Sequence, residues 1–117
     1  MQKILLIINS AAYGSENLFN ALRLALMLQE ENAKPELKLF LMSDAVVAGL
    51  AKQNPNEGYN LQQMLEIITA SGADVKLCKT CTNARGITEL ALAQGVEIGT
   101  LAELAQWTLE ADKVLSF

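Results

Sequence analysis

Histidine is absent from the 117 residues, cysteine and proline occur twice each, and aromatic residues make up only 5% of the chain. The absence of histidine removes the commonest general base and the commonest metal ligand. Two thiolates alone do not complete a zinc site, so we expect no bound metal. Flavin binding would use aromatic side chains for stacking, and their scarcity leads us to expect no cofactor.

Basic clusters and long hydrophobic runs are also missing. The formal net charge is −4, and no basic cluster could neutralise phosphates, so we expect no direct nucleic-acid binding. No apolar run approaches the length of a membrane span, so we expect no membrane association. The short apolar run after Lys3 suits a strand better than a signal peptide, and two cysteines without such a signal indicate reduced thiols. We therefore expect a cytoplasmic protein.

Apolar residues are abundant, at 51% of the chain. The length predicts one domain, residues 1–117, with a core of leucine, isoleucine, valine and alanine. The helix predicted over residues 16–32 is apolar on more than one side, which indicates burial on more than one side. We infer that other copies of the chain cover the surplus apolar surface in a homo-oligomer.

Strand-like and helix-like segments alternate along the chain, which predicts an α/β fold with three α/β/α layers and a mostly parallel five-stranded sheet. We expect a flavodoxin-like strand order, with the first and third strands adjacent and the second nearer an edge. Strands are predicted over residues 3–8, 37–42, 73–78, 96–98 and 112–117, and helices over 16–32, 45–51, 60–70 and 100–110. The predicted N-caps are Ser15, Ser43, Asn60 and Thr100, and the last helix is predicted to bury Leu101, Leu104, Ala105 and Leu109.

Both cysteines lie in one short segment with the spacing Cys78-x-x-Cys81. Cys78 ends the third predicted strand, and Cys81 stands in a polar segment where a helix could begin. Lys76, Lys79 and Arg85 supply positive charge nearby, and a thiol beside cations and free backbone N–H groups is activated as a thiolate nucleophile. The alternative is a buried Cys78 that acts only as a small hydrophobic residue.

The loop after the first strand, Asn9–Gly14, is a second candidate region. In the flavodoxin-like order this loop lies beside Cys78, beyond the carboxyl ends of the strands, where ligands bind. We therefore predict a crevice formed by Asn9, Tyr13 and Gly14, with Tyr59 contributed by the turn-rich segment 52–59 as a lid. The alternative is an ordinary capped loop, because one glycine and no Gly-x-Gly make a poor phosphate loop.

The Cys-x-x-Cys spacing also occurs in dithiol oxidoreductases of the thioredoxin type. The two residues between the cysteines are Lys79 and Thr80, instead of the Gly-Pro of that class. Pro35 and Pro55 both precede the cysteines, so no later proline could supply the cis-proline. A dithiol oxidoreductase that uses Cys78 and Cys81 is therefore kept as an alternative.

Five stretches spread over the whole chain carry a family resemblance. They are AYGSE at 12–16, FLMSDAV at 40–46, EGYN at 57–60, KLCKTC at 76–81 with Arg85-Gly86, and LAQW at 104–107 through ADKVL at 111–115. Together they closely resemble the DsrE/DsrF-like sulfur-relay superfamily. The resemblance implies that a cysteine at the end of the third strand, followed by an Arg-Gly pair, carries sulfur as a persulfide. Cys78 and Arg85-Gly86 fill those positions, whereas Cys81 is an addition to the pattern and Ala45 replaces a glycine of many relatives.

The resemblance also implies a hexamer, and it sets the leading hypothesis of a sulfur carrier or sulfurtransferase. Cys78 would take sulfur from a donor protein and pass it to an acceptor protein, with Lys79, Arg85 and Gly86 supporting the site. Cys81 would be a possible resolving thiol. One alternative is a non-catalytic oligomer of the same fold that binds a small molecule or a partner, and the other is the dithiol oxidoreductase.

Overall fold

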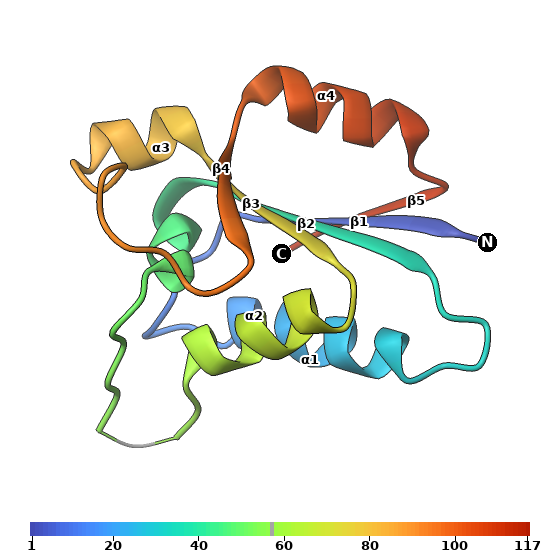
Figure 1. Cartoon of the computed structure of the whole chain (residues 1–117), viewed down its shortest axis with the longest axis horizontal. Coiled ribbons are helices and arrows are strands. Elements are labelled where there is room, and N and C mark those ends of the chain that lie inside the picture. The colour runs from blue at the N-terminus through green and yellow to red at the C-terminus, as the bar shows by residue number, and fades with distance from the viewer. Residues whose placement is uncertain (57) are drawn as a thin grey trace.

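The computed structural model describes residues 1–56 and 58–117; Glu57, in the segment predicted as a lid, lies outside them. A five-stranded parallel sheet carries helices on both faces, which confirms the predicted α/β class (Figure 1). The elements in chain order are β1 (Lys3–Ile8), α1 (Asn17–Gln29), β2 (Glu36–Leu41), the 3-10 helix η1 (Ser43–Gly49), α2 (Leu61–Ala70), β3 (Asp74–Cys78), α3 (Lys79–Ala84), β4 (Val96–Gly99), α4 (Leu101–Glu110) and β5 (Lys113–Ser116).

The strand order is β4-β3-β2-β1-β5, and each neighbouring pair is parallel. The predicted flavodoxin-like order is therefore wrong, because β2 lies between β1 and β3 at the centre of the sheet. Lys38 gave β2 the alternation of an edge strand. Its ammonium lies 4.9 Å from the centre of the Trp107 ring on α4, so this polar position of β2 is covered by a helix.

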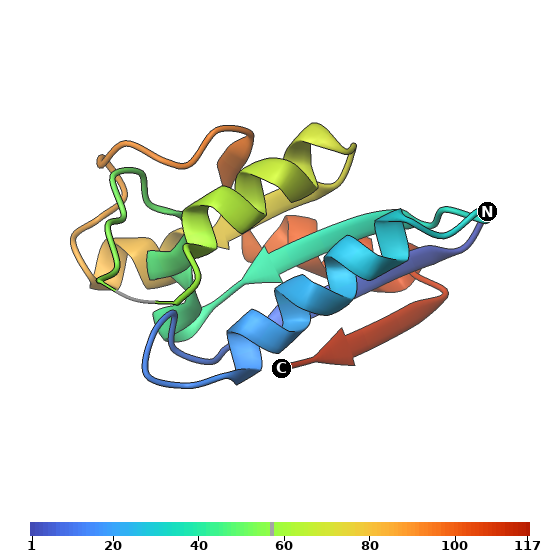
Figure 2. The same cartoon turned by 90° about the horizontal axis from the view of Figure 1, so that it is seen from below.

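The direction in which the chain crosses the sheet determines the face on which each helix lies. From β1 through β3 the chain moves one way, and right-handed crossovers place α1 and α2 on one face. The connection from β4 back to β5 crosses in the opposite direction, which places α4 on the other face. Figure 2 shows α1 and α2 in front of the sheet and α4 behind it. These are the three predicted layers.

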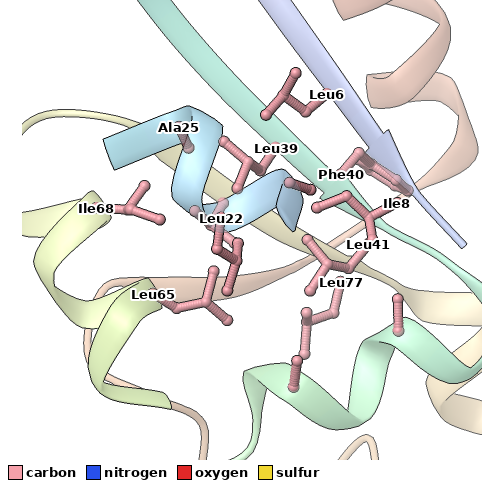
Figure 3. Packing of buried hydrophobic residues seen from close by; sticks show 14 of the residues in the cluster. Leu6, Ile8, Leu22, Ala25, Leu39, Phe40, Leu41, Leu65, Ile68 and Leu77 are labelled. Atoms are coloured by element: carbon pink, nitrogen blue, oxygen red, sulfur yellow. The ribbon is translucent and has the colours of Figure 1, made fainter. Parts of the chain in front are cut away.

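The core on the α1/α2 face is made entirely of aliphatic side chains. In Figure 3, Leu22 of α1 and Leu65 and Ile68 of α2 point toward the leucines of the central strands. Burial of one such side chain contributes roughly 1.5–3 kcal/mol. The residues of this face with no exposed surface include Leu6, Ile8, Leu22, Ala25, Leu39, Leu41, Leu65, Ile68 and Leu77.

Two predicted helix starts are confirmed by their hydrogen bonds. Asn60 is the N-cap of α2, and its side-chain oxygen accepts the N–H of Gln63 at 3.1 Å. Thr100 is the N-cap of α4, where its hydroxyl accepts the N–H of Glu103 and the Glu103 carboxylate accepts the N–H of Thr100. These reciprocal bonds form a capping box, which satisfies two backbone groups that the helix leaves free.

The other two predicted N-caps are wrong. α1 begins at Asn17 with Glu16 as its N-cap, although the Ser15 hydroxyl still accepts the N–H of Asn17 at 3.2 Å. η1 has Met42 as its N-cap and includes Ser43, which adopts a φ of 53°. A residue in this left-handed region departs from the extended backbone that an N-cap typically adopts.

Helix α4 buries fewer residues than its sequence predicts. Leu104 and Trp107 are buried, but Leu101 is 64% exposed, Leu109 is 87% exposed and Ala105 is exposed as well. Trp107 stands edge-on to Phe40, with 6.0 Å between ring centres. Once Trp107 faces the sheet, Leu109 points away, because two residues correspond to about 200° around a helix.

Candidate functional site

Two polar residues meet beyond the carboxyl ends of the central strands. The register pairs Ile8 with Leu41 and Leu41 with Leu77, which brings the following residues to one edge of the sheet. The Ser43 hydroxyl donates to the side-chain oxygen of Asn9 at 3.4 Å. The loop after β1 and the end of β3 therefore share an edge, but β2 separates them, which corrects their predicted direct adjacency.

The two cysteines stand at the junction of β3 and α3. Cys78 is the N-cap of α3 and is only 4% exposed, whereas Cys81, in the first turn of the helix, is half-buried. Both are free thiols. Cys81 occupies the third helical position, so both cysteines lie at the start of α3.

The turn after β2 provides a hydrogen bond to one of these sulfurs. The backbone N–H of Ser43 donates to the Cys81 sulfur at 3.1 Å. Left-handed backbone is uncommon in residues other than glycine, and such outliers cluster at functional sites. The sequence analysis did not select Ser43 as a site residue. The available signal was its position, because Ser43 follows a strand end as Asn9 and Cys78 do.

Arg85 fastens the end of α3 to the same turn. Its Nε and Nη2 atoms donate to one carboxylate oxygen of Asp44 at 3.0 and 2.7 Å, and its Nη1 donates to the backbone oxygen of Cys81 at 3.2 Å. Asp44, next to Ser43, is a second site residue that the sequence analysis missed. The ion pair joins the turn that contacts Cys81 to the helix that carries it.

Gly86 has a backbone role at this site. Its φ is 68°, in the region that glycine adopts without strain. Gly86 N–H donates to the Asn83 oxygen, and Ile87 N–H donates to the Thr82 oxygen, at 3.1 and 3.0 Å. This pair of bonds is a Schellman motif that ends α3. The Arg85-Gly86 pair thus combines a side chain that reaches Asp44 with a residue that lets the helix stop there.

The three predicted cations have different surroundings. Lys76 pairs with Glu103, and its ammonium lies 5.3 Å from the centre of the Trp107 ring, so it serves the α4 interface instead of the cysteines. Lys79 is exposed. Burial raises the pKa of the Cys81 thiol above its usual value, and the neighbouring Cys78 adds to the rise, while the Ser43 N–H and Arg85 oppose it.

The predicted crevice residues other than Asn9 form a separate set of contacts. The Tyr13 hydroxyl donates to the side-chain oxygen of Gln53 at 2.5 Å and accepts the N–H of Leu61 at 3.3 Å. Tyr59 stacks on Phe19 with 3.7 Å between ring centres. Gly14 turns the loop with a φ of 90°. These contacts tie the loop after β1 to the start of α2.

Two features of the described residues concern metal binding and membranes. Within residues 1–56 and 58–117, no three cysteine, aspartate or glutamate side chains gather as metal ligands would. In the same described part, none of the helices combines the length and apolar character that crossing a membrane requires.

Fold and site together define a small parallel α/β protein with a cysteine pair at the carboxyl edge of its sheet. The model of the DsrE/DsrF-like family matches residues 2–117, and the chain belongs to that family. The chain is 67% identical to Protein YchN of Escherichia coli K12 over 117 residues, which is all of both chains. It is 40% identical over 114 residues to an uncharacterized protein of Methanopyrus kandleri, covering 97% of this chain and 93% of the relative.

Solved structures agree with the fold. The crystal structure of the YchN protein from E. coli superposes with a TM-score of 0.97 over 100% of both chains, at 67% identity. A protein of unknown function from Methanobacterium thermoautotrophicum gives a TM-score of 0.82 over 100% of both chains, at 11% identity. At that low identity the second likeness shows the fold alone.

Proposed function

We propose that this protein is a sulfur carrier that holds sulfur as a persulfide on Cys78. The observation that carries the proposal is the position of Cys78 at the end of β3, beside Cys81 and within the element that Arg85-Gly86 closes, in a chain of the DsrE/DsrF-like family. Sulfur relay is the activity that this family suggests. The reaction needs a thiolate and a surface for partner proteins, and it uses no metal and no histidine.

The proposed loading step moves one sulfur atom without net oxidation. The Cys78 thiolate attacks the outer sulfur of a donor persulfide, R–S–SH. A bond forms between the Cys78 sulfur and that outer sulfur, and the S–S bond of the donor breaks. The electron pair of the broken bond leaves with R–S⁻, and the protein keeps Cys78–S–SH. An acceptor thiolate then removes the outer sulfur by the same exchange and restores the Cys78 thiolate.

The surroundings of Cys78 suit storage between two encounters. Cys78 is only 4% exposed, which limits the contact of its sulfur with solvent. Lys79 follows directly and is exposed, which offers a charge for a donor or acceptor protein to contact. We propose a cytoplasmic setting, because reducing conditions there keep cysteine thiols free to exchange.

We propose further that the carrier is a homo-oligomer, a hexamer. Edge strand β5 pairs with β1 on one side only. Val114 and Leu115 on β5 are 41% and 38% exposed, and Leu109 on α4 is more exposed still. Exposed apolar side chains beside a strand edge are typical of surfaces that associate. Native mass spectrometry should give six copies, and Leu109→Lys should reduce that number if α4 lies in an interface.

Intact-mass spectrometry tests the carrier chemistry directly. The protein is incubated with a small-molecule persulfide, and one bound sulfur adds about 32 Da. We expect this adduct in wild type and in the matched control Cys81→Ser, and we expect none in Cys78→Ser. An adduct at full stoichiometry in Cys78→Ser would overturn the assignment. A wild-type protein that gains no sulfur, with Cys78 slow to alkylate, would favour the binding oligomer.

A further inference from the structure

The turn after β2 holds one backbone N–H against the Cys81 sulfur. Ser43 adopts a φ of 53° there, and its N–H donates to that sulfur at 3.1 Å. Left-handed backbone costs energy in a residue other than glycine, so the surrounding structure must hold it. Arg85 supplies such a hold, because it donates to Asp44, the next residue, and to the backbone oxygen of Cys81. The turn and the start of α3 are therefore fastened at two points.

The direction of the Ser43 hydrogen bond matters for the chemistry of the thiol. The sulfur is the acceptor, and an ionised sulfur accepts an N–H more strongly than a neutral one does. Burial has the largest effect and raises the pKa of the Cys81 thiol, and the neighbouring Cys78 adds to the rise, whereas the Ser43 N–H and Arg85 lower it. Because burial prevails, only a minority of Cys81 is ionised near neutral pH, and the turn enlarges that minority.

The backbone at the start of α3 permits a bond between the two cysteines. Cys78 is the N-cap and Cys81 is the third residue of the helix. Helix geometry places the Cα atoms of residues three apart at about 5 Å, and disulfides usually join Cα atoms roughly 4.4–6.8 Å apart. The Cys-x-x-Cys spacing is the one that dithiol proteins use for such exchange. Attack of one cysteine on the other is therefore compatible with the fold.

We propose that the Ser43 N–H stabilises the thiolate of Cys81 and so makes it the nucleophile that clears sulfur from Cys78. Asp44 and Arg85 are positioning residues that hold the turn. This inference rests on the proposed function of Cys78. In the clearing step the Cys81 thiolate attacks the inner sulfur of Cys78–S–SH. A Cys78–Cys81 bond forms, the bond to the outer sulfur breaks, and its electron pair leaves with HS⁻. Because few Cys81 thiols are ionised, clearance is slow, and an acceptor that docks in time takes the sulfur first.

The donor is tested in the Cys78→Ala protein, in which Cys81 is the remaining thiol. Its ionisation is followed by the rate of iodoacetamide alkylation between about pH 6 and pH 11. Ser43→Gly keeps the N–H and the left-handed backbone, so Cys81 should ionise as before. Ser43→Pro removes the N–H and cannot adopt that φ, so about 2- to 10-fold less Cys81 should be ionised near pH 7. Equal ionisation in the two variants would overturn the role of Ser43.

The positioning residues are tested in the same background. Asp44→Ala and Asp44→Asn remove the same charge, but asparagine still offers Arg85 an oxygen. Loss of a nearby negative charge by itself favours the Cys81 thiolate equally in both variants. We expect Cys81 to be about 2- to 5-fold less ionised in Asp44→Ala than in Asp44→Asn, because only the alanine variant releases the turn. The same ionisation in this pair would contradict the positioning role.

Release of sulfide tests the clearing step itself. Wild type and Cys81→Ser are loaded with a small-molecule persulfide, separated from it, and followed by intact mass and a sulfide assay. Loaded wild type should slowly lose H₂S, about 34 Da, as the disulfide forms, whereas loaded Cys81→Ser should keep its sulfur. Sulfur that persists equally in both proteins would overturn the clearing role and leave the carrier proposal standing. Failure to load either protein would overturn the carrier proposal and the clearing step together, while the ionisation results for Cys81 would stand.

Discussion

The two faces of the sheet are built from different chemistry. Side chains alternate along a strand, so Leu39 and Leu77 face α1 and α2, whereas Lys38 and Lys76 face α4. Cys78 shares the alternation of Lys76 and therefore lies on the second, mixed face. The first face is dry and aliphatic, and the second combines lysine stems, Trp107 and an ion pair. The comparison indicates that one face supplies stability, while the other leaves room for polar chemistry at its end.

The largest predicted effect tests the dry face. Leu39→Ala removes a side chain with no exposed surface from the centre of the sheet. We expect the free energy of unfolding to fall by about 2–5 kcal/mol, because the cavity cannot collapse fully. Urea unfolding followed by circular dichroism measures this change. Lys38→Ala, the neighbour on the mixed face, is the matched control, and an equal loss there would remove the distinction between the faces.

A smaller effect is expected where the dry face approaches the site. A Cβ on Gly49 of η1 would lie 2.6 Å from both Cδ atoms of Leu77, the residue before Cys78. Because Leu77 is fully buried, it has little room to move. We expect Gly49→Ala to cost about 1–3 kcal/mol in the free energy of unfolding, as overpacking does. The same urea measurement applies, and Gly58→Ala, whose Cβ would meet nothing within 4 Å but whose φ is 80°, shows the cost of strained backbone without overpacking.

The dry face was largely predictable from sequence, whereas the mixed face was not. Leu61, Leu65 and Ile68 recur at helical spacing, and they are buried as that spacing predicts. Lys38 led to a wrong prediction, because a charged residue in a strand predicts an exposed position. In the structure, Lys38 packs against Trp107. The alternation of β2 therefore suggested an edge, and the strand order that followed was wrong. A contact between residues 69 positions apart leaves no signal in local periodicity.

Site side chains that lie at strand ends could be predicted from the sequence. A hydrogen bond donated by a backbone N–H could not. Cys78, Arg85 and Gly86 were selected from residue type and family resemblance, and their predicted roles remain to be tested. The Ser43 N–H was missed, because any residue except proline carries that group and its direction depends on a left-handed turn. Asp44 was missed because its partner, Arg85, lies 41 residues away.

A further prediction sharpens the comparison at the end of the mixed face. Gly86→Ala places a side chain at a φ of 68°, where no atom within 4 Å would obstruct it. The cost is therefore conformational, and we expect a loss of about 1 kcal/mol in the free energy of unfolding. The Schellman motif should loosen, and with it the hold of Arg85 on Asp44. Gly72→Ala, at another left-handed glycine, controls for the backbone cost in the urea measurement, and only Gly86→Ala should change the rate of Cys78 alkylation.

The smallest predicted effect is the acid response of the Lys76–Glu103 pair. The hydrogen bond from Lys76 lowers the pKa of Glu103 below its usual 4.5, and the N–H of Thr100 contributes. A carboxylate with a lowered folded-state pKa stabilises the protein above its unfolded-state value, and that contribution is lost as pH falls through the folded-state value. Stability should therefore decline below about pH 4.5 as Glu103 takes up a proton.

Comparing variants isolates this contribution from the other carboxylates. Urea midpoints measured from about pH 6 to pH 3 should fall less steeply in Lys76→Met than in wild type, because the variant lacks the donor that lowers the pKa of Glu103. Lys38→Met also removes a lysine beside Trp107 but leaves the Glu103 pair intact, so it should keep the wild-type slope. Equal slopes in wild type and Lys76→Met would show that the ion pair adds nothing to the mixed face. Its cohesion would then come from the packing of Trp107 against the lysine stems and Phe40.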